Sequence, residues 1–372
     1  MRWPSSRQSL VAVDCGARSV RAVQLAFGEE LPTVVHWLNT ESRSPVSSPA
    51  SAGTAGAKEA AGTSVSLAGI EQFDTRRAGL LVGPSEAEYC LLTVPGAVWS
   101  QDPASLADAI RWEVGRRLSC PIDEAELGAW PLPGPMGGGS NAMAVAAQRP
   151  GIVSAIGSLD SEHMDCERVE PAALSLVRAC RASALCEQDE IWGVLDLGHT
   201  GNRLYLAVDS TPVFARSVRG GGHNWTQLIA KELRVEPALA EDYKRKSGIG
   251  TDARGCRTSP SSVERLSEAA LPGVLLSILR GPLADMLADV ERAFRFVMEQ
   301  YPRRQAGALV LVGGGSRMPG LADWLSRELG VKAAPAGSNG VLKITPSHPM
   351  SRTEIYSVMA GCVGMALGEG PP

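Results

Sequence analysis

The sequence has no excess of basic residues. It carries 36 Lys and Arg against 40 Asp and Glu, which gives a formal net charge of -4 over 372 residues. This balance excludes the basic surface that nucleic-acid binding requires, so we expect no nucleic-acid partner. The sequence also lacks a run near the roughly 20 apolar residues of a membrane-spanning helix, because its best candidates, 274–279 and 355–367, are short or interrupted. The segment before Asp14 is not typical of a secretory signal. We therefore expect a cytoplasmic protein that meets a membrane only through a partner.

The sequence has no C-x-x-C pair among its eight cysteines, and its five histidines show no ligand spacing. In a long chain without an export signal this favours reduced thiols over a disulfide framework or a zinc site. We expect no transition metal bound by protein ligands.

The length of the chain predicts two or more lobes, each with its own core. Residues 40–66 are rich in Ser, Ala, Gly and Pro, a composition that cannot bury a core. We expect a disordered loop there.

Two segments far apart share one layout, VAVDCGARSVRAVQL from Val11 to Leu25 and VLDLGHTGNRLYLAV from Val194 to Val208. In each, β-forming residues lead into Asp-x-Gly, and a second apolar strand follows a short polar turn. Glycine lets the turn bring backbone N–H groups close to an oxyanion. The carboxylates of Asp14 and Asp196 stand where a hydrated divalent cation would bind. The alternative is that both carboxylates only cap turns.

Two later motifs support a nucleotide site. The first is Val169-Glu170-Pro171-Ala172-Ala173-Leu174, a strand end that opens a helix. The second is the apolar run from Ala308 to Val312, which enters three glycines before the helix MPGLADWLSRELG. A strand, a glycine turn and a helix N-terminus form an anion seat.

The order of these four motifs resembles that of the actin-like ATPase superfamily. Within it the chain is most similar to the PilM family of type IV pilus assembly, with FtsA and MreB as more distant relatives. The segments that carry this resemblance are Ala109 to Glu113 (AIRWE), Cys120 to Glu124 (CPIDE), Val213 to Ser217, Gly221 to Thr226, Ile229 to Leu233 and Ala240 to Lys244.

The resemblance implies an α/β fold of the actin-like kind, a duplicated ribonuclease H-like fold with two lobes around a nucleotide cleft. It assigns residues 1–96, 167–190 and 351–372 to subdomain IA, 97–166 to an inserted subdomain IC, 191–221 and 305–350 to IIA, and 222–304 to IIB.

The resemblance also implies the cofactors ATP and Mg²⁺, with Asp14 and Asp196 near the metal through waters. The nucleotide would be bound by Asp14, Gly16, Ser19, Arg21, Asp196, Gly198, Thr200, Gly221, Gly222, Glu241, Lys244, Gly313, Gly314, Gly315 and Met318. Glu170 would orient the attacking water as a general base, or alternatively serve only as an acid at a helix start. The turns hold few hydroxyl residues, so we expect at most a slow ATPase.

The implied partners are other pilus assembly platform proteins and the cytoplasmic tail of a PilN-like membrane protein, at the cytoplasmic face of the inner membrane. That tail would bind between IA and IC, where Trp112 and Trp130 could anchor it or could pack only the core of IC. The alternative function is a filament-forming cytoskeletal ATPase like FtsA or MreB. A type II secretion scaffold and a metabolic kinase of the same superfamily are weaker alternatives.

Overall fold

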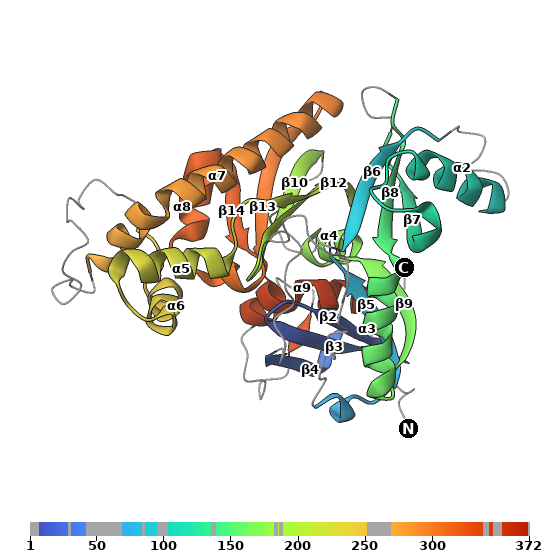
Figure 1. Ribbon diagram of the computed structural model, residues 1–372, viewed down its shortest axis with the longest axis horizontal. Coiled ribbons are helices and arrows are strands. Elements are labelled where there is room, and N and C mark those ends of the chain that lie inside the picture. Colours follow the sequence, from blue (N-terminus) through green and yellow to red (C-terminus); the bar gives the residue numbers. More distant parts are fainter. Residues whose placement is uncertain are drawn as a thin grey trace.

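The computed structural model describes residues 7–28, 31–41, 69–83, 86–94, 103–134, 139–181, 185, 189–250, 269–337, 342–344 and 352–370. The loop expected at 40–66 lies outside the described residues from residue 42 onward. Figure 1 shows two lobes, each with its own sheet, and a smaller third sheet at the upper right. We call the lobe with the N-terminal sheet lobe I, and the lobe with the sheet of residues 190–335 lobe II.

The lobe I sheet is built on the first predicted hairpin. Its strands are β1 (Arg7–Gln8), β2 (Val11–Cys15), β3 (Ser19–Phe27), β4 (Thr33–Glu41), β5 (Arg77–Val82), β9 (Asp165–Pro171) and β15 (Lys343–Ile344). The order is β15-β4-β3-β2-β5-β9, with β1 paired to β3. Strands β2, β3 and β4 are antiparallel neighbours, whereas β5 pairs in parallel with β2 and β9 with β5.

The lobe II sheet repeats this arrangement. It contains β10 (Glu190–Leu197), β11 (Asn202–Val208), β12 (Thr211–Val218), β13 (Gln305–Val312) and β14 (Lys332–Pro335), in the order β12-β11-β10-β13-β14. The first three are antiparallel, and β13 and β14 follow in parallel. The order and directions match those of β4-β3-β2-β5-β9. The two similar hairpins thus begin two sheets of one topology, which is a duplicated fold.

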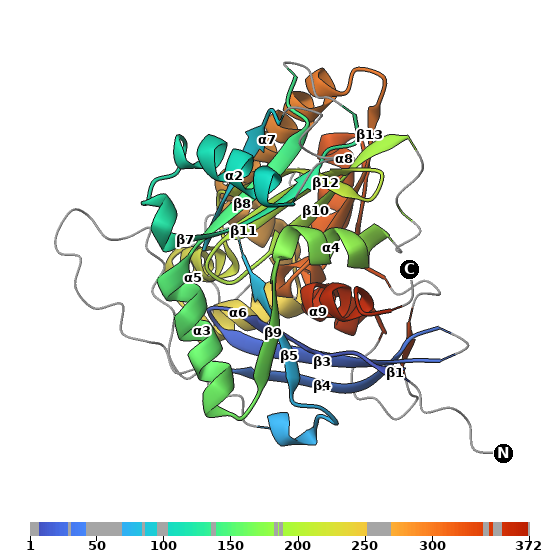
Figure 2. The ribbon, with the colours of Figure 1, turned by 90° about the vertical axis from the view of Figure 1, so that its right-hand side faces the viewer.

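Strands β2 and β10, which occupy the same position in the two sheets, are apolar because both faces of each strand are covered. Successive residues point to opposite faces, so Ala12 packs with α4 (Ala172–Arg181) and α9 (Arg352–Leu367), while Val11 and Val13 pack in a second cluster with Leu159 of α3 (Arg149–Ser161). On β10, Trp192 and Val194 belong to the same core as α4 and α9. Helices α4 and α9 therefore form a layer between the two sheets (Figure 2).

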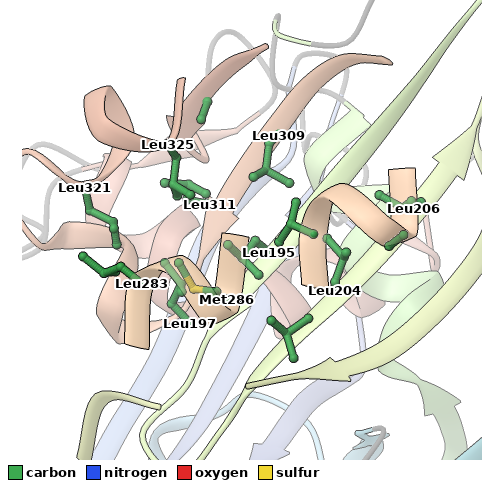
Figure 3. Packing of buried hydrophobic residues seen from close by; sticks show 14 of the residues in the cluster. Leu195, Leu197, Leu204, Leu206, Leu283, Met286, Leu309, Leu311, Leu321 and Leu325 are labelled. Carbon is green, nitrogen blue, oxygen red and sulfur yellow. The ribbon is translucent and has the colours of Figure 1, made fainter. Parts of the chain in front are cut away.

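The other face of the lobe II sheet is covered by helices. These are α5 (Gly222–Leu233), α6 (Pro237–Lys246), α7 (Leu271–Gln300) and α8 (Leu321–Leu329). Helix α7 buries an apolar stripe within 282–300, made of Leu283, Met286, Val290, Ala293, Phe294 and Val297. Figure 3 shows Leu283 and Met286 beside Leu195 and Leu197 of β10. In the part of the chain that the structure describes, α7 is the one helix long and apolar enough to cross a membrane, and this packing is that of a core helix.

The third sheet is the inserted unit. It contains β6 (Ala87–Leu92), β7 (Ala125–Pro131) and β8 (Ala142–Gln148) in the order β6-β8-β7, with α2 (Pro103–Gly115) packed on it. Short 3-10 turns cover Ile70–Gln72 (η2), Ile122–Glu124 (η3) and Gly314–Arg317 (η5). Because β6 starts at Ala87, the sheet of the inserted unit begins before the expected boundary at 97. Helix α3, expected inside the insertion, packs against lobe I through Leu159.

The inserted unit also contacts lobe II. Trp130 is buried, its Nε1–H donates to the carbonyl of Pro212 at 2.8 Å, and its ring meets Tyr89 edge to face. Trp130 thus packs between subdomains and does not offer an exposed anchor. Trp112 on α2 is 71% exposed.

Candidate functional site

The first Asp-x-Gly hairpin turns between β2 and β3. The N–H of Gly16 donates to the carbonyl of Ser19 at 3.0 Å, which closes the turn. Asp14 lies directly opposite Arg21 across the two strands. The Arg21 Nη1 donates to the Asp14 Oδ2 at 3.0 Å, so this carboxylate has a cationic partner on its own hairpin.

The second hairpin repeats this pair. Asp196 lies opposite Arg203, and the Arg203 Nη1 donates to the Asp196 Oδ2 at 3.3 Å. A side chain at Gly198 would place its Cβ only 2.5 Å from the carbonyl oxygen of Gly201, so the turn needs glycine. Asp196 was predicted from the sequence as a site residue, but Arg203 was not. The signal was present, because each aspartate is followed by an arginine seven residues later.

Both hairpins line one cavity of about 600 Å³ between the lobes. A volume of this size suits a small-molecule or cofactor site. The cavity brings together seven of the predicted residues: Asp14, Gly16, Arg21, Asp196, Gly198, Thr200 and Gly313. It is also lined by residues that were not predicted: Arg18, Gly83, Glu86, Glu88, His199, Arg203, Tyr205 and Ser357.

The glycine run after β13 lies against the end of β10. Gly313 has a φ of 79° and would place a Cβ 2.5 Å from the Asp196 Oδ1, so only glycine fits there. Gly315 would place a Cβ 2.8 Å from the Cβ of Leu197. Gly314 and Gly315 do not line the cavity, and Met318 is buried in the lobe II core. Gly313 and Gly315 therefore let the backbone after β13 pack closely against Asp196 and Leu197 at the second hairpin.

Glu241, which is partly buried, and Lys244, which is buried, form a cluster beside the cavity. The Lys244 Nζ donates to Gly222 O at 2.9 Å, to Thr226 Oγ1 at 2.7 Å and to Glu241 Oε2 at 2.5 Å. Burial lowers the pKa of Lys244. Although burial opposes the shift, hydrogen bonds from Lys244 and Thr226 lower the pKa of Glu241. This cluster fixes the start of α5.

Several predicted residues therefore lie outside the cavity lining. They are Ser19, Gly221, Gly222, Glu241, Lys244, Gly314, Gly315 and Met318. The cluster around Lys244 is nevertheless linked to lobe I, because the Arg18 Nη1 lies 3.6 Å from the Glu241 Oε1.

Glu170 does not line the cavity. Its carboxylate accepts from Arg178 Nη1 at 2.9 Å and from the Ser175 hydroxyl, both on α4. The same Arg178 atom donates to the carbonyl of Gly364 on α9 at 2.7 Å. Glu170 thus joins the end of β9 to the helix layer. The role as general base stays a prediction, and these contacts favour a structural acid.

The cavity wall toward the inserted unit carries Glu86. Its Oε2 accepts from the N–H of Gly83 at 3.2 Å, and burial raises the pKa of its carboxyl. The Arg203 Cζ lies 3.5 Å from where a Cβ on Gly83 would stand, so the guanidinium reaches from Asp196 in lobe II to lobe I. His199 also lines the cavity. Burial and the neighbouring Arg18 lower the pKa of His199.

The residues do not fit the expected magnesium site. Mg²⁺ takes oxygen ligands in octahedral geometry, but one oxygen of Asp14 and one of Asp196 already accept from arginine. Each guanidinium places a positive charge beside the carboxylate that was expected near the cation. No group of three or more His, Cys, Asp or Glu able to hold a metal ion occurs within the described ranges.

Solved structures of other proteins share this fold. No protein-family model and no curated protein matches the chain. Among solved structures, it is similar to the PilM-PilN type IV pilus biogenesis complex with a TM-score of 0.72 and 20% identity, over 98% of this chain and 99% of that chain. The chain has the PilM fold. MreB5 of Spiroplasma citri bound to ADP is also similar, with a TM-score of 0.46 and 12% identity over 99% of this chain and 100% of that one.

The PilM fold confirms the expected actin-like, duplicated α/β architecture. Two sheets of one topology face a common helix layer, and the two Asp-x-Gly hairpins meet at the cavity between them. In this chain, each hairpin places an aspartate and its arginine at that cavity.

Proposed function

We propose that this chain is a cytoplasmic scaffold of the type IV pilus assembly platform. It binds ATP between its lobes and holds the cytoplasmic tail of a PilN-like protein at the inner membrane. The observation that carries the proposal is the likeness to a PilM-PilN complex over 98% of this chain and 99% of that chain. A fold match that leaves out almost nothing of either chain favours the whole scaffold over a shared domain.

The cavity supports nucleotide binding. Its glycine turns supply backbone N–H groups, and Arg18, Arg21 and Arg203 supply cationic donors for phosphate oxygens. Thr200 is the hydroxyl residue of the second turn. Because Glu170 lies outside this lining, we propose that the nucleotide acts mainly by being bound and that hydrolysis is at most slow.

Ligand-dependent stability tests nucleotide binding. A ligand that binds only the folded protein adds about 2.7 kcal/mol at 100 times its Kd. ATP should therefore raise the unfolding midpoint of the full chain. An unchanged melting curve at millimolar ATP would remove nucleotide binding from the proposal.

The partner surface is proposed between lobe I and the inserted unit. Exposed aromatic side chains often dominate peptide binding. Of the two tryptophans that the structure describes in this unit, Trp112 on α2 is exposed and Trp130 is buried. An extended tail can add backbone hydrogen bonds at a sheet edge. Strands β6 and β7 are the two edges of the small sheet.

Titration with a peptide tests the pilus assignment. A synthetic peptide copying the cytoplasmic tail of a PilN-like protein should bind in calorimetry. It should shift amide signals in residues 103–131 and not in α5 or α6. The Trp112→Ala variant should weaken binding, whereas Phe296→Ala, which removes an exposed aromatic ring from lobe II, should not.

Absence of binding to the folded, ATP-loaded chain would contradict the scaffold. The alternative would then be a filament-forming ATPase like FtsA or MreB. Sedimentation and electron microscopy of the ATP-loaded chain would reveal such filaments.

A further inference from the structure

Arg203 lines the cavity from the second hairpin, as Arg21 does from the first. It lies on β11 opposite Asp196, and its side chain is 28% exposed. Its guanidinium contacts Asp196 in lobe II and lies close to Gly83 in lobe I. A cationic group therefore spans the cleft where the two Asp-x-Gly turns meet.

The two aspartates expected near a metal each have an arginine of their own. Asp14 accepts from Arg21 at 3.0 Å, and Asp196 accepts from Arg203 at 3.3 Å. Each pair is built into its strand register, because the two residues are direct cross-strand partners. The charges of the two carboxylates are thus balanced by two guanidinium groups before any ligand arrives. A divalent cation placed there would meet two positive charges at short range.

A guanidinium can do what a bound cation would do for a phosphate. It has five N–H donors in a rigid planar fork, so donors remain after one of them has bonded to a carboxylate oxygen. It also keeps its positive charge at every working pH. Arginine binds phosphate oxygens in a bidentate manner, and such charge-assisted bonds are among the stronger hydrogen bonds in proteins. Arg203 can therefore remain paired with Asp196 while it donates to a phosphate in the cavity.

We propose that Arg203, together with Arg21, takes the place of the divalent cation, so that the cavity binds nucleotide phosphates without a metal ion. This inference rests on the proposed nucleotide binding. It differs from the sequence expectation, in which Asp14 and Asp196 hold hydrated Mg²⁺. The ligand class is a free nucleoside polyphosphate.

Titration calorimetry of the full chain with ATP, once in excess Mg²⁺ and once in EDTA, tests the inference. The wild-type Kd should differ by less than about threefold between the two conditions. Arg203→Gln should lower the affinity in EDTA by about tenfold or more, since it removes a charged donor to phosphate. Mg²⁺ should then restore part of the binding, because Asp196 has lost its cationic partner.

Control variants separate this effect from general loss of stability. Arg304 pairs with Asp209 at 2.8 Å and does not line the cavity. Arg304→Gln should therefore leave both Kd values unchanged. If Arg203→Gln does not fold, Arg21→Gln and Arg203→Lys provide the same comparison, with Arg203→Lys retaining more affinity in EDTA.

The outcomes distinguish the two proposals. Wild-type binding that weakens more than about tenfold in EDTA overturns the metal-free inference alone and leaves nucleotide binding intact. Equal binding by Arg203→Gln and wild type in EDTA also overturns it. An absence of ATP binding under both conditions overturns nucleotide binding and this inference together.

Discussion

Replacement of Glu170 by glutamine should destabilise the fold and leave nucleotide binding unchanged. The Glu170 side chain is 9% exposed and accepts from Arg178 at 2.9 and 3.5 Å and from the Ser175 hydroxyl. A hydrogen bond to a charged group contributes about 1.5–3 kcal/mol. Solvent reaches 35% of the Arg178 side chain and screens the pair. We expect Glu170→Gln to reduce the free energy of unfolding by about 2 kcal/mol.

Urea denaturation followed by tryptophan fluorescence measures this change. The midpoint should fall while the slope stays constant, because the surface exposed on unfolding is the same. Glu167→Gln is the matched control, since Glu167 lies on the same strand β9 but pairs with Arg77 in solvent. It should change the midpoint little. A Glu170→Gln variant as stable as wild type, with reduced ATP turnover in a single-turnover assay, would refute the structural role and favour the general base.

Three further predictions concern other contacts. Lys244→Met should lower the unfolding free energy by about 2–3 kcal/mol in thermal or urea melts, since Glu241 and Gly222 O lose a buried donor; an unchanged melt would contradict this. Burial and Arg18 lower the pKa of His199 below its usual 6.5, so the folded chain binds protons less readily than the unfolded chain. Stability should therefore fall as pH drops below 6.5, and His199→Gln should flatten that slope in pH-dependent melts. Trp130→Phe removes the bond to Pro212 and should cost about 1 kcal/mol in melts while leaving peptide titration unchanged.

The sequence alone determined the local features of the site. Strand, glycine turn and strand are specified within fifteen residues, because alternation of side chains and the turn both depend on near neighbours. The pairs Asp14–Arg21 and Asp196–Arg203 arise from the same hairpins, since seven residues separate direct cross-strand partners. The length of the chain predicted two or more lobes, and the order of the four motifs carried the resemblance to the actin-like fold.

Packing between distant segments determined the roles of individual residues. Glu170 ends a strand as predicted, but its direction depends on Arg178, which also binds Gly364 of the last helix. Trp130 is buried against lobe II, where the carbonyl of Pro212 accepts a hydrogen bond from its Nε1–H. The end of a strand specifies only that a side chain can leave the sheet. The bond from Arg178 to Gly364 joins segments 186 residues apart, and the bond from Trp130 to Pro212 joins segments 82 residues apart. No local pattern contains that information.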